Sequence, residues 1–154
     1  MKKSLIAKDI KFWNARGADE LFASNAYRYA ATCFLSMNLL GFVKLFRKES
    51  KEELKHRTML ENFANDMGTE LDMPAIPAVK LPEGPMAILD YLYKMELDLL
   101  AEYEMGCEEC DRVASKVLCQ DMVKIQIEGV GAIADLIAEL ETTDIATMNL
   151  RLLA

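Results

Sequence analysis

All four prolines of this 154-residue chain lie within one stretch of twelve residues that ends at Pro85. Proline cannot donate a helical hydrogen bond and disfavours helix at the residue before it, so the stretch from about Gly68 to Gly84 is predicted to be extended. On either side lie roughly fifty to sixty residues of helix-favouring sequence, each weakly interrupted once, near 38–41 and near 108–113. The sequence therefore predicts an all-α chain with four long helices in two pairs.

The extended stretch is long enough to change how a helical bundle is connected. About sixteen extended residues span roughly 50 Å, whereas a helix of about twenty-eight residues is roughly 42 Å long. The stretch can therefore run the full length of a four-helix bundle and make the second and third helices parallel, unlike those of an up-down-up-down bundle. We expect one domain over residues 1–154, with a short fifth helix or an extension of the fourth near 144–150.

The charge balance narrows the classes of partner. With 18 basic and 25 acidic residues the formal net charge is −7, which argues against a general nucleic-acid binder, because such proteins neutralise phosphates with Lys and Arg. Cations match this acidic chain better as ligands.

The sequence also bears on location. No segment reaches membrane-spanning length, and the basic start of the chain lacks the apolar run of a signal peptide. We therefore expect no nucleic-acid or membrane partner and a cytoplasmic protein, or an organellar one if a transit peptide has been removed.

The four cysteines are interpreted as small buried side chains in a reducing compartment, because a chain of this size can build its own core without disulfides. Cys107 and Cys110 form one C-x-x-C pair, which could be half of a redox or metal site. A zinc or rubredoxin-like iron centre needs a second such pair. The sequence alone assigns no role to this pair.

Each predicted helix carries an apolar stripe at alternating steps of three and four residues, the pattern of a helix that faces a bundle core. Every stripe is interrupted by a polar side chain. The third stripe, for example, runs through Leu89, Leu92, Glu96, Leu99 and Tyr103. An unpaired carboxylate is costly to bury, so the acids on these stripes need partners.

Six side chains on the four stripes could converge near the middle of the bundle: Glu20, Tyr27, Glu53, His56, Glu96 and Gln126. The chain has one histidine, and no arginine lies on the four stripes, so a bound cation is the simplest partner for the carboxylates. Several carboxylates and an imidazole suit iron, manganese or zinc. Glu53 and His56, three residues apart, share one helix face and can bind one metal together.

Two other interpretations of these residues stay open at this point. Because 25 of 154 residues are acidic, an acid three residues before the only histidine arises by chance about one time in six. In one alternative, the polar residues belong to a solvated helix face in a slightly different register. In the other, they bind a structural metal or set the helix register.

The sequence resembles the ferritin family over about residues 13–141. Glu20 is followed seven residues later by Tyr27, as in the first helix of ferritins, and Glu52-Glu53-Leu54-Lys55-His56 matches their E-E-x-x-H helix. The run from Leu71 to Pro77 is similar to the crossover of bacterial and plant ferritins. Glu96 stands at the position of the third-helix ligand, and Gln126-Ile127-Glu128 matches the fourth-helix Q-x-E. The resemblance implies a ferritin-like four-helix bundle of the non-haem, maxi-ferritin type.

The resemblance also implies roles for the six residues. Glu20, Glu53 and His56 would hold one iron, and Glu53 would bridge to a second iron held by Glu96. Gln126 would orient a water or an oxygen-derived ligand. Tyr27 would hydrogen-bond a ligand carboxylate and supply an electron during oxidation. The implied cofactor is iron, two Fe per subunit.

The resemblance is incomplete in places. Gly129 stands where many bacterial ferritins have a Glu, so the resemblance does not extend to their third iron site. Lys116 and Cys119 align with acids that line the three-fold pore of ferritins, so the route of iron into the protein is not defined. On the inner surface, Lys55 and Thr58 occupy positions that are acidic in some relatives.

Related families are separated by simple features. Bacterioferritins and rubrerythrins have a second E-x-x-H, which this chain with its single histidine lacks. Leu54 stands where a haem-binding bacterioferritin has Met, so no haem is expected.

The resemblance implies iron storage and detoxification as the function. Fe(II) would be oxidised by dioxygen or hydrogen peroxide, and a ferric mineral would be stored in a self-assembled cage of twenty-four subunits. The alternative is a ferritin-like di-iron oxidase or peroxidase without storage.

Overall fold

The computed structural model describes residues 5–154, and that part of the chain contains five α-helices. Their bounds are α1 Ala7–Ser36, α2 Leu40–Asp66, α3 Pro85–Glu109, α4 Val113–Thr142 and α5 Ile145–Leu153. The four long helices and the two short interruptions between them were all expected from the sequence. None of the described helices is both long and apolar enough to cross a membrane.

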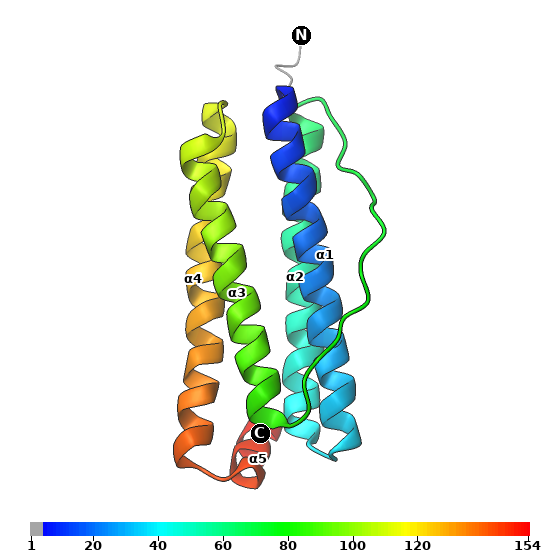
Figure 1. Cartoon of the computed structure of the whole chain (residues 1–154), viewed down its shortest axis with the longest axis vertical. Coiled ribbons are helices and arrows are strands. Elements are labelled where there is room, and N and C mark those ends of the chain that lie inside the picture. Colours follow the sequence, from blue (N-terminus) through cyan, green and yellow to red (C-terminus); the bar gives the residue numbers. More distant parts are fainter. Residues whose placement is uncertain (1–4) are drawn as a thin grey trace.

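The long helices form two antiparallel pairs, α1 with α2 and α3 with α4, that pack into one bundle (Figure 1). The segment 67–84 leaves the end of α2 and runs along the outside of the bundle to its opposite end, where α3 begins (Figure 1). α2 and α3 are therefore parallel, and the predicted crossover topology is confirmed. Gly84, with a positive φ of 95°, and Pro85 in the first turn of α3 mark the end of the crossover.

Specific polar contacts hold the crossover against the bundle. The guanidinium of Arg57, in α2, donates to the backbone oxygen of Asp72 at 2.8 Å, and the backbone N–H of Asp72 donates to the side chain of Asn14, in α1, at 2.8 Å. Arg57 lies so close to α1 that a Cβ at Gly17 would be 2.4 Å from its Nη1. A side chain at position 17 would therefore require the end of the buried arginine to shift.

The core consists of two apolar clusters that occupy the two ends of the bundle and leave its middle for polar residues. One contains Phe34, Phe42, Phe46, Leu89, Leu92 and Ile133, with the Phe34 and Phe42 rings stacked 4.7 Å apart. The other contains Trp13, Leu60, Leu99, Tyr103, Cys119 and Met122. Most of these residues are fully buried. Leu89, Leu92, Leu99 and Tyr103 are the apolar residues of the predicted third stripe. The apolar stripes are thus the part of the pattern that defines the core.

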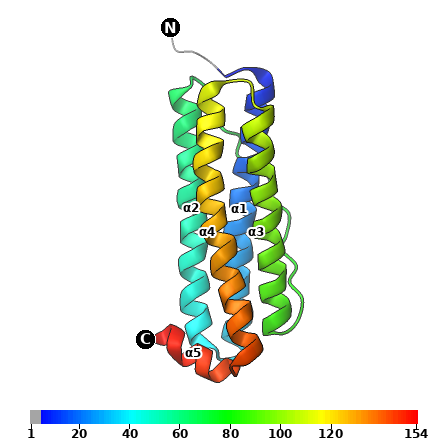
Figure 2. The same ribbon diagram turned by 90° about the vertical axis from the view of Figure 1, so that its left-hand side faces the viewer.

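The segment after α4 forms a separate fifth helix rather than an extension of the fourth (Figure 2). The Asp144 side chain caps α5 by accepting the backbone N–H of Thr147 at 2.9 Å. α5 then folds back against the start of α2, where Met148 is buried in the core.

The sequence offers four residues beside the stripes as candidates for an assembly surface, with a widened core as the alternative: Leu35, Leu39, Val43 and Leu97. Val43 is buried within the chain and Leu39 packs against the core, so for these two residues the alternative holds. Val43 lines a surface hollow between α1 and α2 together with Leu35, so packing between these two helices widens the core there. Leu35 and Leu97 are exposed, at 47% and 38%.

Candidate metal centre

A layer of polar side chains crosses the bundle between the two apolar clusters. Its carboxylates come from three helices: Glu20 in α1, Glu53 in α2 and Glu96 in α3, exposed by 0%, 4% and 2%. Each was predicted from an interruption of an apolar stripe. Each carboxylate lies near the middle of its helix, and the two ends of that helix pack in the two apolar clusters. The clusters therefore fix the position of the layer between them.

Glu20, Glu53 and His56 form the first part of the layer. They offer one ligand atom each within 4.8 Å of one another, and among residues 5–154 they are the only group of three such side chains. His56 Nδ1 lies 3.0 Å from Glu53 Oε2 and 3.6 Å from Glu20 Oε2. The i, i+3 spacing on α2 therefore brings the imidazole and one carboxylate together, as predicted, while α1 supplies the other carboxylate.

The two oxygens of Glu20 have different surroundings. Oε1 accepts a 2.6 Å hydrogen bond from the hydroxyl of Tyr103, whereas Oε2 is buried and has no hydrogen-bond partner. A buried carboxylate oxygen without a donor is costly, and a bound cation removes that cost. The donor set of two carboxylates and one imidazole therefore fits a divalent transition metal such as iron.

Glu96 forms the second part of the layer and is held from two sides. The Tyr27 hydroxyl, in α1, donates to its Oε1, and Gln126 Nε2, in α4, donates to its Oε2 and to its backbone oxygen at 3.1 Å. Gly129, one turn after Gln126, leaves room beside this carboxylate, because a Cβ there would be 3.4 Å from Glu96 Oε2. The structure thus brings all six predicted residues into one layer, in two hydrogen-bonded sets.

Burial shifts the protonation of this layer toward the neutral acids. It raises the pKa of Glu53 to about 9, and burial also raises the pKa of Glu96 against the hydrogen bonds from Tyr27 and Gln126. For His56, burial opposes the charged form, but the carboxylates of Glu20 and Glu53 beside the ring outweigh burial and raise the imidazole pKa to about 10. Without a cation the layer retains protons at neutral pH, and a divalent metal would displace them.

No arginine neutralises these carboxylates. Arg16 and Arg57 are buried, but Arg16 pairs with Asp19 and Glu102 on the outer side of α1 and α3, at 2.8 and 2.9 Å. Arg57 faces Glu61 and the crossover instead. The sequence has no arginine on the stripes, and in the structure His56 is the only basic group among residues 5–154 that contacts the acids of the layer.

Tyr103 was not recognised as a site residue from the sequence. It lies on the predicted stripe of α3 and is fully buried, but its hydroxyl belongs to the polar layer. A signal was present: the Glu20-to-Tyr27 spacing of seven residues recurs in α3 between Glu96 and Tyr103. Burial and the contact with Glu20 raise the pKa of Tyr103 well above its usual value, so that its hydroxyl remains a donor.

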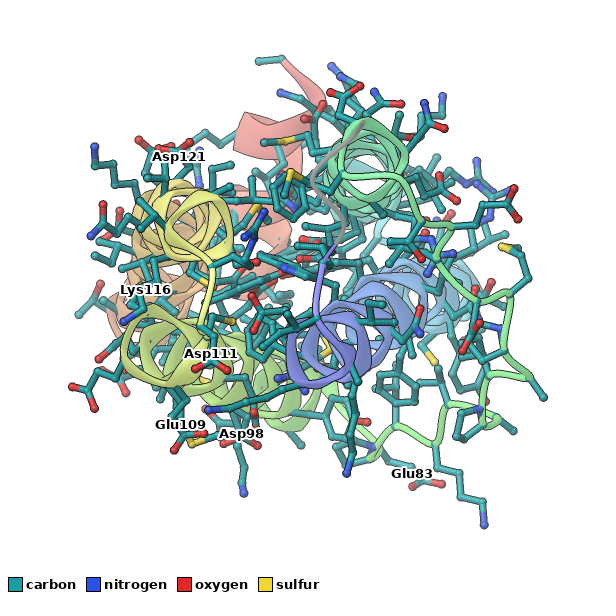
Figure 3. The ribbon with its side chains drawn as sticks, turned by 90° about the horizontal axis from the view of Figure 1, so that it is seen from above. Glu83, Asp98, Glu109, Asp111, Lys116 and Asp121 are labelled. Atoms are coloured by element: carbon teal, nitrogen blue, oxygen red, sulfur yellow. The ribbon has the colours of Figure 1, made fainter. Side chains whose placement is uncertain are left out.

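Other residues singled out in the sequence lie away from the layer. Glu49 is half-buried on the same face of α2, and burial raises its pKa. Cys119 is fully buried in the apolar cluster at the α3–α4 end, so within one chain it does not line an opening. Lys116 lies at that end with Glu109 and Asp111 nearby on the outer surface (Figure 3). All four cysteines are free thiols.

Comparisons with known proteins agree with this architecture. The model of the ferritin family, described as a ferritin-like domain, matches residues 10–143. The chain superposes on an open-pore ferritin from the hyperthermophilic archaeon Archaeoglobus fulgidus with a TM-score of 0.88 and 22% identity, covering 97% of this chain and 98% of that chain. No curated protein matches the sequence.

Two further solved structures are similar. A humanised archaeal ferritin gives a TM-score of 0.89 at 22% identity, with 97% of both chains covered. An engineered closed form of the Archaeoglobus fulgidus ferritin gives 0.88 at 22% identity, covering 97% of this chain and 96% of that chain. At this level of identity the superpositions establish a shared fold.

Proposed function

The chain belongs to the ferritin family, and on that premise we propose that it stores and detoxifies iron. In this proposal each subunit binds two Fe(II) at the polar layer and oxidises them with dioxygen or hydrogen peroxide. The ferric product then moves to a mineral inside a cage of twenty-four subunits. The free thiols suit a reducing compartment such as the cytoplasm.

One observation carries the proposal: Glu20 Oε2 is buried without a partner beside Glu53 and His56. Burial of an unpartnered acid oxygen inside an otherwise apolar bundle makes sense when a cation occupies the space in front of it. The family supplies iron as that cation. The two buried arginines pair elsewhere, and the nearest donor, His56 Nδ1, stays 3.6 Å from this oxygen.

The residues of the layer divide the work of holding the substrate. Glu20 and His56 would bind the first Fe(II), and Glu96 would bind the second. Glu53 would be a ligand of both ions. Tyr27 and Gln126 fix both oxygens of Glu96, so this ligand is preoriented by helices α1 and α4. The closed apolar clusters on both sides limit access of water. The paired iron ions supply one electron each to the oxidant.

An anaerobic Fe(II) titration followed by exposure to oxygen tests this function. We expect binding to saturate at two Fe(II) per subunit, followed by rapid oxygen consumption. Saturation without oxygen consumption would instead support a structural metal. The mass of the native particle after iron loading then separates storage from a soluble oxidase: a particle near twenty-four chain masses supports storage, and a stable monomer or dimer contradicts it.

A further inference from the structure

Two tyrosines of the polar layer are arranged reciprocally. In α1, Tyr27 follows Glu20 by seven residues, and in the antiparallel α3, Tyr103 follows Glu96 by seven. Each hydroxyl donates to the carboxylate of the other helix: Tyr103 to Glu20 at 2.6 Å, and Tyr27 to Glu96. Each tyrosine is therefore separated from a metal position by one carboxylate, and the two halves of the layer are equivalent in this respect.

This arrangement suits the transfer of an electron from a phenol. A tyrosine loses an electron most readily when its proton can leave along a hydrogen bond at the same time, and a carboxylate is a good acceptor for it. Tyr103 donates to Glu20 Oε1, which leaves Oε2 free to hold the metal. Both rings are almost completely buried, at 0% for Tyr103 and 1% for Tyr27, so an oxidised ring would be protected from solvent.

We propose that Tyr103 is a second redox-active tyrosine of the centre, so that one subunit holds the four electrons needed to reduce dioxygen to water. The inference rests on the proposed oxidation of Fe(II). It adds to that function a product, water in place of hydrogen peroxide, and assigns a chemical role to a residue that holds no metal itself.

The reaction balances with the groups that are present. Two Fe(II) become two Fe(III) and give two electrons, and two phenols become neutral tyrosyl radicals and give two electrons and two protons. With two further protons from solvent, one dioxygen becomes two waters. Two additional Fe(II), each with one proton, then return the radicals to tyrosine. The complete cycle oxidises four Fe(II) per dioxygen.

The test uses the assembled wild-type protein mixed with two Fe(II) per subunit and oxygen, frozen at short times for electron paramagnetic resonance. Hydrogen peroxide is measured in parallel. We expect a tyrosyl signal approaching two spins per subunit and almost no peroxide. Y103F leaves three electrons per subunit, one short of the four that water requires, so peroxide should appear and the tyrosyl signal should fall by at least half. In Y27F/Y103F the radical should vanish and peroxide should reach one per two irons, the two-electron product.

Tyr29→Phe is the matched control, because Tyr29 lies on α1 near Tyr27 but is 44% exposed and outside the layer. It should leave both the radical and the peroxide yield unchanged. Anaerobic titration with Co(II), whose visible spectrum reports its ligands, shows whether each variant still assembles the metal site. If Y103F fails to fold, the wild-type spin count still decides the matter, because Tyr27 alone could supply at most one spin per subunit, and two irons with one tyrosine fall one electron short of water.

Two results would overturn the inference. One is a Y103F protein that binds Co(II) as the wild type does and keeps the full radical signal without releasing peroxide. The other is a wild-type signal that stops at one spin per subunit. A wild-type protein that oxidises Fe(II) and releases one peroxide per two irons removes only this inference, whereas one that does not oxidise Fe(II) removes the proposed function itself.

Discussion

The backbone N–H of Gly41, in the first turn of α2, donates to the side chain of Asn149 in α5 at 2.6 Å. The two helices approach so closely there that a Cβ at position 41 would be 2.1 Å from the backbone oxygen of Asn149. The short helix α5 therefore packs directly against the backbone at Gly41. This contact, between residues 108 positions apart, fixes the position of the last helix.

Gly41→Ala should detach or displace α5, because the clash involves backbone that cannot rotate away. We expect a loss of about 1–3 kcal/mol in the free energy of unfolding, measured by urea denaturation, and faster proteolysis near Thr143. Gly131→Ala is the control. Position 131 also lies inside a helix but has nothing within 4 Å of an added Cβ, so alanine there should stabilise by roughly 0.5–1 kcal/mol. Equal stabilisation by both substitutions would contradict the close packing of α5 against Gly41.

Glu53→Ala should remove the ligand shared by both metal positions. We expect rapid Fe(II) oxidation, followed by stopped-flow absorbance, to slow by roughly tenfold or more. Glu52→Ala is a neighbouring control, since the Glu52 side chain pairs with Lys55 and lies outside the polar layer. An unchanged rate in Glu53→Ala would sink the assignment of this residue.

His56→Ala should weaken one metal position much more than the other, because the imidazole lies beside Glu20 and Glu53 and not beside Glu96. An anaerobic titration should then show one strong and one weak site per subunit, with at least about tenfold between them. Comparable weakening of both sites would show that the division of ligands is wrong.

The metal-free protein should lose stability as the pH rises. Burial raises the pKa of Glu53 from 4.5 to about 9, so its contribution is fully present below the unfolded value and is lost as the pH rises through 9. The raised pKa of His56 acts in the same direction, with its contribution lost as the pH rises through about 10. We expect the melting temperature in chelator to fall from about pH 5 to pH 9, and to fall less in Glu53→Gln.

Added metal should reverse that trend. Binding requires the acids and the imidazole to lose their protons, so affinity for Zn(II), a redox-inert probe, should rise over the same pH range. Calorimetry in buffers of different ionisation enthalpy should detect proton release at pH 7. A zinc affinity that does not change with pH would contradict the proton-retaining layer.

The sequence by itself was sufficient for the features that depend on local spacing. Prolines that cannot continue a helix predicted the crossover, and helical periodicity predicted which positions of each helix face the core. The same periodicity placed Glu20, Glu53 and Glu96 on inward faces, because positions three, four and seven apart share one side of a helix whatever surrounds it. Val43 was not predicted to be buried, because its burial beside the stripe depends on how closely α1 and α2 pack.

Only the tertiary structure decided which groups meet. Tyr103 and Glu20 are 83 residues apart, and the antiparallel alignment of α1 with α3 puts the hydroxyl on one oxygen of Glu20 and leaves the other without a partner. The same alignment turned a repeated spacing into a reciprocal pair of hydrogen bonds. Register between helices is set by how whole apolar faces interlock, and no local pattern carries that information. The sequence determined which residues face inward, and packing between helices determined which of their atoms meet.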